Sequence, residues 1–348
     1  MKHRKFVGNL ITYGLVTAAF FLCSFWQSHG MSYTLQDMLI PICCYIVLAV
    51  SLNLTVGISG ELSLGHAGFM AIGAFTGAIV STWMRAAFSG MSAEVNLLLS
   101  ICAGGLLSMA AGALVGIPVL RLRGDYLAIV TLAFGEIIRN VLNMFYFSLE
   151  GTALHGSFGN PNLPGKMVYN GAAGISGVRM ISTFTAGYLL VMFTLIVVLN
   201  LINSRSGRAI MATRDNRIAA QSVGINVTRY KMMAFVTSAA LAGMAGALYG
   251  LNYYSMQSSK FNVDTSIQIL VFVVMGGLGN MRGTVIATTL LYMLPQLLRD
   301  FAQYRMLIYA LMLILVMVLG NNPMIRNLWM SISPFRKRDL KRRLEARE

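Results

Sequence analysis

The chain has 348 residues, of which 56% are hydrophobic and 11% are charged, and its formal net charge is +15. About a quarter of the residues in a soluble domain are charged. The few charged residues of this chain could not cover its apolar surface in water. The composition therefore excludes an ordinary soluble fold and predicts an integral membrane protein, because a bilayer solvates apolar surface directly.

Apolar runs long enough to cross a bilayer follow one another along the chain. About 20 apolar residues of helix span a hydrocarbon core of about 30 Å. Runs without Asp, Glu, Lys or Arg cover residues 6–26, 38–60, 95–120, 180–204, 232–259 and 306–325. Two further candidates are 62–84 and 126–147, and two shorter runs, 265–281 and 283–298, form brief spans or a re-entrant pair. We predict an all-α integral membrane protein, a polytopic bundle of about ten transmembrane helices in a single domain over residues 1–348.

Basic residues gather at three places, namely the N-terminus, the loop 204–231 and the tail 326–348. In membrane proteins Lys and Arg concentrate in cytoplasmic loops, so this pattern places both termini and the 204–231 loop in the cytoplasm. The segment 148–179 carries few basic residues and is expected to be an outer loop. The basic tail is read as a topology anchor near anionic lipid rather than as a nucleic-acid site.

Small residues recur every four positions at Gly104, Ser108, Gly112 and Gly116, and the pairs Gly73/Gly77 and Gly246/Gly250 repeat this spacing. Small side chains along one helical face allow a neighbouring helix to approach closely. The spacing therefore predicts a tightly packed bundle.

The first group of polar residues at membrane depth lies in "NLTVGISGELSLGHAGF", residues 53–69. Asn53, Glu61, Ser63 and His66 interrupt two apolar runs, as a broken helix does where its backbone lines a cavity. Half-helix ends in such a segment could bind the ammonium or carboxylate of a small zwitterion. The alternative is an inner-side turn, with Glu61 in water and His66 packed against a neighbour.

Two further groups are candidates for the translocation pathway. Glu136 and Arg139 lie three residues apart on one helix face, where a structural ion pair is favoured over direct contact with substrate. The sequence "GGLGN" at 276–280, which begins with Gly276 and Gly277, separates the two short apolar runs and could be a re-entrant element.

The most polar stretch between apolar runs is "TRDNRIAAQSVGIN", residues 213–226. Asp215 as N-cap and Gly224 after the last turn predict a helix over about residues 216–223. Ile218, Ala219, Ser222 and Val223 share one face of this helix, with Arg217 and Gln221 on another. A lone helix of this length is marginal in water and needs a surface, either the inner face of its own bundle or a partner protein.

At these residues the sequence resembles the membrane permease subunits of ABC importers for branched-chain amino acids, the LivM family. The resemblance rests on "LNLTVGISGELSLGHAGFMAIGAF", "GDYLAIVTLAFGEIIRNVLN", "NGAAGISGV", "GRAIMATRDNRIAAQSVGINVTRYKMMAFVTSAALAGMAGALYG" and "QILVFVVMGGLGNMRGT". It implies a multi-pass protein of the bacterial cytoplasmic membrane, a LivH-like second permease subunit, an extracytoplasmic substrate-binding protein and separate ATPase subunits. The ATPase would dock on a coupling helix that includes Asp215, Arg217, Ile218, Ala219, Ser222, Val223 and Gly224.

Other functions remain open at this point. Sister branches of the family carry urea, short amides or sugars, and a secondary transporter would need no ATPase. A membrane-embedded enzyme would need a reacting group, for which His66 with Ser63 is the candidate. We expect no cofactor, metal or nucleotide site, because the chain contains no metal-spaced His or Cys cluster, nucleophile elbow or P-loop.

Overall fold

The computed structural model describes residues 2–30, 32–88, 90–122 and 124–297, together with residues 307, 310, 311 and 314. The expected span 306–325 is thus described at four positions, and the basic tail 326–348 lies outside the described residues. The chain divides into two compact units, Met1–Thr289 and Leu290–Glu348. The single domain over 1–348 stays a prediction.

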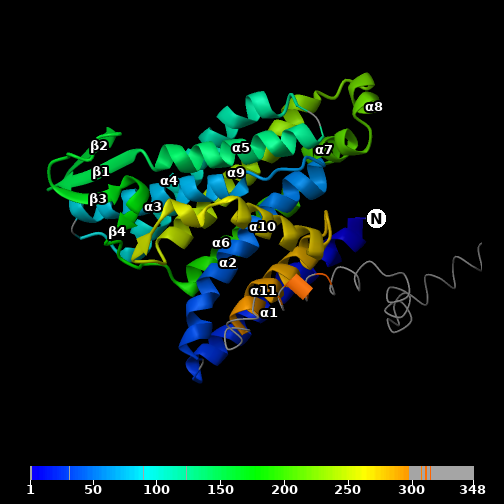
Figure 1. Ribbon diagram of the computed structural model, residues 1–348. Coiled ribbons are helices and arrows are strands. Elements are labelled where there is room, and N and C mark those ends of the chain that lie inside the picture. The colour runs from blue at the N-terminus through cyan, green and yellow to red at the C-terminus, as the bar shows by residue number, and fades with distance from the viewer. Residues whose placement is uncertain are drawn as a thin grey trace, which may run out of the picture. The chain divides into compact units, whose positions relative to one another are not determined.

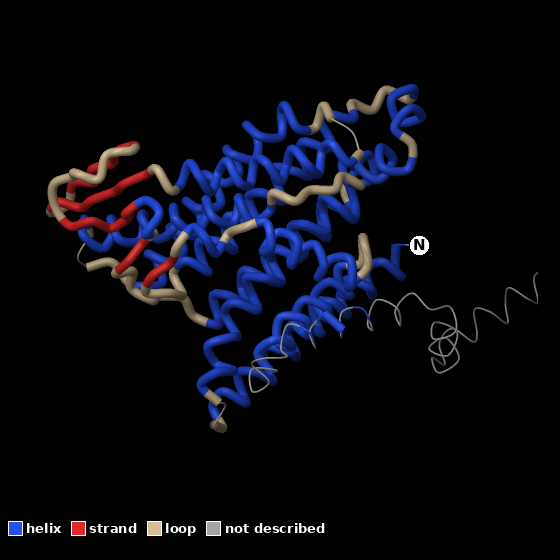
Figure 2. Tube along the Cα trace, in the orientation of Figure 1, coloured by secondary structure: helices blue, strands red, loops and turns tan. Residues whose placement is uncertain are grey.

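Helices dominate the first unit (Figures 1 and 2). In chain order the α-helices are α1 Lys2–Ser28, α2 Tyr33–Asn53, α3 His66–Ala87, α4 Ala93–Val119, α5 Asp125–Leu142, α6 Phe184–Asn203, α7 Arg205–Asp215, α8 Arg217–Ser222, α9 Val227–Gly250, α10 Val263–Gly276 and α11 Met281–Leu297, the last of which continues into the second unit.

Among the described residues, 5 helices are long and apolar enough to cross a membrane, judged by length and composition. They are Leu35–Ser59, which is α2 with a π-helical extension, and α3, α4, α6 and α9. The predicted mostly helical, membrane-spanning character is confirmed, whereas the count of about ten spans stays a prediction.

Two of the expected spans end earlier than their apolar runs. The run 126–147 is helical to Leu142, and Phe145 begins a strand. The run 232–259 is helical to Gly250, and Ser255 begins another strand. Aromatic residues suit strands as well as membrane helices, so the absence of charge alone could not mark these ends. The two short runs form separate helices, α10 and α11, joined by a turn over residues 277–280.

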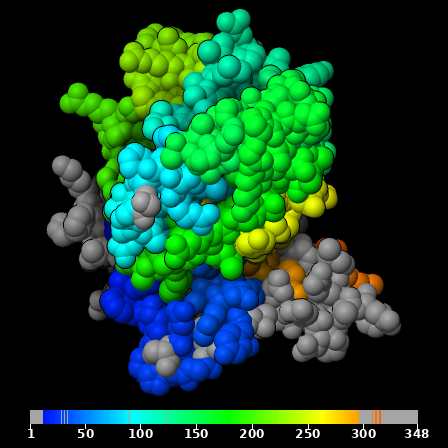
Figure 3. All heavy atoms as spheres, turned by 90° about the vertical axis from the view of Figure 1, so that its left-hand side faces the viewer, coloured from blue at the N-terminus to red at the C-terminus, as the bar shows by residue number. Residues whose placement is uncertain are grey.

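A small antiparallel sheet adds to the helices, in the order β2-β1-β3-β4-β5. The strands are β1 Phe145–Glu150, β2 Ala153–Phe158, β3 Lys166–Asn170, β4 Ile175–Ser176 and β5 Ser255–Met256. The all-α expectation therefore needs correction for the segment 148–179, which was expected to be a loop. Figure 3 shows this segment in green, next to the cyan end of α3 and α4.

Tyr169 joins the sheet to the helices. Its ring is fully buried, and its hydroxyl donates a hydrogen bond to the carbonyl oxygen of Leu142 at the end of α5. Burial raises the pKa of the Tyr169 phenol. The sheet is therefore attached to one end of the helical unit, and α8 lies at the other end in Figure 1.

The core of the first unit is the contact of α3, α4 and α9 along their small residues. A Cβ atom on Gly104 would lie 2.9 Å from the carbonyl oxygen of Gly73 and 2.9 Å from the Cβ of Ala247. Ser108 donates a hydrogen bond of 2.7 Å to the carbonyl oxygen of Ala239. The predicted close helix packing is confirmed, because backbones this near leave no room for larger side chains.

Candidate functional site

The interruption predicted between α2 and α3 is present. The helix α2 continues as a buried π-helix, Leu54–Ser59, which ends at Gly60 with a φ of +76°. Residues 61–65 are not helical, and α3 starts at His66. Short π-helical turns inside longer helices often mark functional sites, because they distort the hydrogen-bond ladder. We call residues 54–65 the break.

Asn53, directly before the break, binds the turn between α10 and α11. Its side chain is fully buried, donates a 2.7 Å hydrogen bond to Thr284 Oγ1 and accepts one of 2.8 Å from the backbone N–H of Gly279. Its Nδ2 also lies 3.5 Å from the carbonyl oxygen of Gly277. The predicted candidates Asn53 and Gly277 are thus brought together, and Gly276 packs beside the backbone of Thr284.

Two basic residues that the sequence did not single out, Arg214 and Lys231, bind residues of the break. Arg214 of α7 donates a hydrogen bond to the carbonyl oxygen of Gly57, and a Cβ atom on Gly60 would lie 2.8 Å from its Cγ. Lys231 of α9 forms an ion pair with Glu61, and their side chains are 12% and 14% exposed. The alternative that placed Glu61 in water is therefore wrong. The only sequence signal for either residue was membership of the basic loop 204–231.

His66 is packed against a neighbouring helix, as the alternative reading expected. Its Nε2 lies 2.8 Å from Ser51 Oγ, and the ring is 2% exposed. Ser63 is also buried, but its hydroxyl has no hydrogen-bond partner among the described residues. The Ser63 and His66 pairing required for the enzyme alternative is therefore not formed.

The third group lies on α5. Glu136 Oε2 and Arg139 Nη2 are 2.6 Å apart, and the two side chains are 27% and 28% exposed. A pair within one helix stabilises it by about 0.2–0.5 kcal/mol. Placing a charge near the middle of a membrane helix costs about 2.5–3.5 kcal/mol on insertion scales. The ion pair alone therefore does not offset the cost of the two charges in an expected span.

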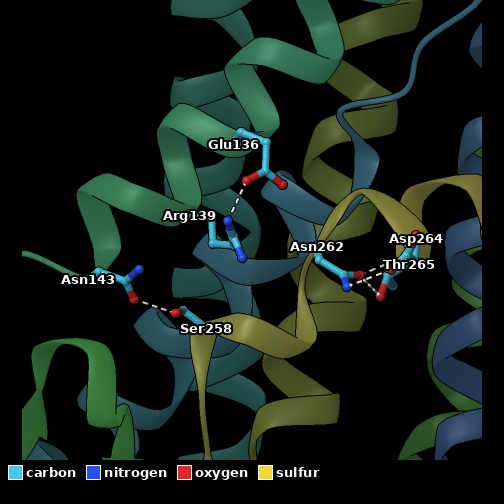
Figure 4. Close-up of polar contacts among 7 residues, drawn as sticks. All are labelled: Glu136, Arg139, Asn143, Ser258, Asn262, Asp264 and Thr265. Carbon is cyan, nitrogen blue, oxygen red and sulfur yellow. Dashed lines mark hydrogen bonds and ion pairs between the residues drawn. The ribbon is translucent and has the colours of Figure 1, made fainter.

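Polar groups from another part of the chain lie near this pair. Asn143, one turn beyond Arg139, accepts a hydrogen bond from Ser258 Oγ. Asn262 caps α10, accepting a 3.0 Å hydrogen bond from the backbone N–H of Thr265. Figure 4 shows Glu136 and Arg139 on the side of α5 that faces the segment 258–265.

The segment 213–226 forms the end of α7 and the whole of α8. Asp215 is the last residue of α7, and Asn216 is the N-cap of α8, accepting a 3.0 Å hydrogen bond from the N–H of Ala219. The predicted N-cap Asp215 is therefore wrong by one residue, because the chain forms two helices where one was expected. Gly224 follows α8 with a φ of +84°, as predicted for the residue after the last turn.

Two apolar side chains, Ile218 of α8 and Val223 at its C-cap, are largely exposed in the part of the chain that the structure describes. Ile218 is 79% exposed and Val223 is 75% exposed, and Ala219 and Ser222 are exposed as well. The buried residue of the helix is Ala220. The alternative that Ile218 and Val223 pack against the inner face of their own bundle is therefore wrong.

Comparison with known proteins gives a consistent result. A family model described as the branched-chain amino acid transport system / permease component matches residues 34–317. The chain is 38% identical over 294 residues to the high-affinity branched-chain amino acid transport system permease protein LivM of Salmonella typhimurium. It is 35% identical over 293 residues to LivM of Escherichia coli. Each match covers 79% of this chain and 66% of the relative.

A more distant relative is the probable branched-chain amino acid transport permease protein LivM of Methanocaldococcus jannaschii. It is 24% identical over 286 residues, which cover 75% of this chain and 79% of the relative. No solved structure matches the chain.

Proposed function

Because the chain belongs to the family of permease components of branched-chain amino acid transport systems, we propose that it is the transmembrane permease subunit of an ATP-driven importer. Its substrates are branched-chain amino acids, namely leucine, isoleucine and valine. The alternative is the same architecture carrying urea, short amides or another small solute. The chain is not itself an enzyme in this proposal, and a separate subunit hydrolyses ATP.

The observation that carries this proposal is the exposed apolar face of α8. Ile218 projects from a short capped helix that begins directly after Asn216, and Val223 projects from the C-cap residue of this helix. A helix of 6 residues has little stability of its own, and apolar side chains in water favour a contact with a partner. An ATPase subunit docked here would reach the bundle through α7, because Arg214 is hydrogen-bonded to the break. A secondary transporter would leave this face without a role.

The proposed assembly includes a LivH-like second permease subunit, ATPase subunits and an extracytoplasmic substrate-binding protein. Both termini and α8 lie on the cytoplasmic side of the bacterial inner membrane, as the basic clusters favour. The sheet, at the other end of the first unit in Figure 1, then faces outward.

The pathway residues fall into two sets in this proposal. The first set lies in or directly beside the break and the turn between α10 and α11, and consists of Asn53, Glu61, Ser63, His66, Gly276 and Gly277. Because Asn53 and Arg214 join these parts directly, a shift of α7 changes the break and the turn together. Glu136 and Arg139 form the second set, on α5, and their side chains are 27% and 28% exposed.

The test is the double substitution Ile218→Asp with Val223→Asp. Both side chains are largely exposed, so their replacement removes little buried area and the permease should reach the membrane at normal levels. We expect the ATPase no longer to copurify and ATP-dependent leucine uptake in proteoliposomes to be lost, because charge is placed in a dry docking surface.

Two control variants accompany this test. Gln221→Asp adds a negative charge to the other face of α8 and should leave docking largely intact. Arg217→Ala should also have a small effect, because charges at the rim of an interface are screened. Unchanged association and uptake in the double variant would remove α8 as the coupling element.

A further inference from the structure

The ion pair between Glu136 and Arg139 on α5 differs in kind from the ion pair between Lys231 and Glu61 at the break. Lys231 and Glu61 belong to different segments, are nearly buried, and so fasten α9 to the chain before α3. Glu136 and Arg139 belong to one helix, and their bond joins no second element. Both side chains remain more than a quarter exposed. Holding the fold together therefore does not explain why two charges lie in this expected span.

The guanidinium of Arg139 also has unused bonding capacity. Its Nη2 contacts Glu136, whereas its Nε is buried and has no hydrogen-bond partner in the part of the chain that the structure describes. A guanidinium presents its N–H groups in a planar fork that fits a carboxylate with two parallel hydrogen bonds. Arg139 is thus placed to accept a second anionic group, and α5 is lightly covered, with Leu127, Ala128 and Thr131 as its buried residues.

We propose that Glu136 and Arg139 recognise the two charged ends of a zwitterionic amino acid, with the Glu136 carboxylate binding the ammonium group and the Arg139 guanidinium binding the carboxylate. This inference rests on the proposed permease function and names the groups that bind its substrate. Side chains three residues apart on a helix are about 5–6 Å apart at their Cβ atoms. In an α-amino acid the ammonium and carboxylate groups are attached to the same carbon atom, so a single ligand can contact both side chains.

Exchange of partners makes this arrangement suitable at membrane depth. Without ligand the two side chains neutralise each other, and with ligand each binds a group of opposite charge. The site is net neutral in both states, so no unpaired charge is exposed to lipid at any stage. A solute with one charge would leave one side chain unpaired, and a neutral solute such as urea or a sugar would not need the pair. The site therefore selects zwitterions over the other solute classes.

The test measures direct binding of three ligands to the purified permease and ATPase complex, without the binding protein, whose own specificity would mask the result. The ligands are leucine, leucinamide, which lacks the carboxylate, and 4-methylpentanoate, which lacks the ammonium group. The wild type should bind leucine at least about tenfold more tightly than either analogue. Wild-type binding without this preference would overturn the proposal.

Substitutions assign each end of the ligand. In Arg139→Gln, the affinities for leucine and leucinamide should differ by no more than about threefold. In Glu136→Gln, the affinities for leucine and 4-methylpentanoate should differ by no more than about threefold. A purely structural pair would change expression or stability but leave these ratios at their wild-type values. Variants that assemble and retain the wild-type ratios would overturn the proposal.

A second pair of variants covers the case in which the neutral substitutions fail to assemble. Glu136→Asp and Arg139→Lys keep both charges but shorten the carboxylate arm or remove the fork. Each should assemble and lose about tenfold in leucine affinity, whereas unchanged affinity would overturn the proposal. Failure of the permease function itself gives a different result, because no ATPase would copurify with the wild type.

Discussion

Asn53 should be one of the most sensitive polar positions in the bundle, and the change that tests this is Asn53→Ala. The substitution removes the 2.7 Å hydrogen bond to Thr284 and the 2.8 Å bond from Gly279. Thr284 keeps a partner, because its hydroxyl also donates to the carbonyl oxygen of Asn280 at 3.0 Å. The N–H of Gly279 loses its side-chain acceptor. One lost bond and one unpaired, partly buried donor together should cost about 2–4 kcal/mol of stability.

The cysteines of α2 provide the assay for this loss. Cys43 and Cys44 are 7% and 0% exposed, so a thiol-reactive dye labels them only as the protein unfolds on heating. The more accessible Cys23 and Cys102 are first replaced with Ala. Asn280→Ala is the matched control, because this exposed side chain accepts one long bond of 3.4 Å from Gly283. Equal midpoint temperatures for the two variants would refute the assignment of Asn53 as the link between the break and the turn.

Two further predictions concern topology and packing. A single cysteine at Asn160 should react with an impermeant reagent from outside, and one at Ser206 should react from the cytoplasm, because the basic loop 204–231 is expected inside. Labelling of a cysteine at Ser206 from outside would contradict this orientation. Gly73→Ala should destabilise the fold by about 1–3 kcal/mol and lower the unfolding midpoint temperature, because the added Cβ would overlap the carbonyl group of Gly243. Gly14→Ala is the control and should leave the midpoint unchanged, because a Cβ atom there has nothing within 4 Å. Equal midpoints for the two variants would show that α3 and α9 are not packed as described.

Runs without charged residues located the long apolar helices well, because a helix that crosses a membrane must carry few charges. It could not locate the ends of α5 and α9, since aromatic residues such as Phe145 and Phe147 satisfy a strand equally well. The N-cap of α8 was misplaced for a similar local reason. Asp215 and Asn216 are both good capping residues, and only the end of α7 decides between them.

The candidate site was predictable in its residue types but not in its partners. A polar residue at membrane depth marks Asn53 and Glu61 as unusual, and both prove to bind other segments. Their partners Gly279 and Lys231 lie 226 and 170 residues away in the sequence, where no local pattern connects them. Arg214 and Lys231 were visible only as part of a basic loop, because a charge cluster predicts a side of the membrane and not a contact.

The join between α7 and α8 separates two tasks that a single longer helix would combine. Asn216 has an extended backbone, with φ of −152° and ψ of 105°, so the direction of α8 is set by the dihedral angles of this one residue. The side chains that α8 presents to a partner are not the ones that bind the break, which come from α7 and α9. The six residues of α8 together with Val223 should therefore be exchangeable between related permeases, altering which ATPase is accepted while the bundle stays unchanged.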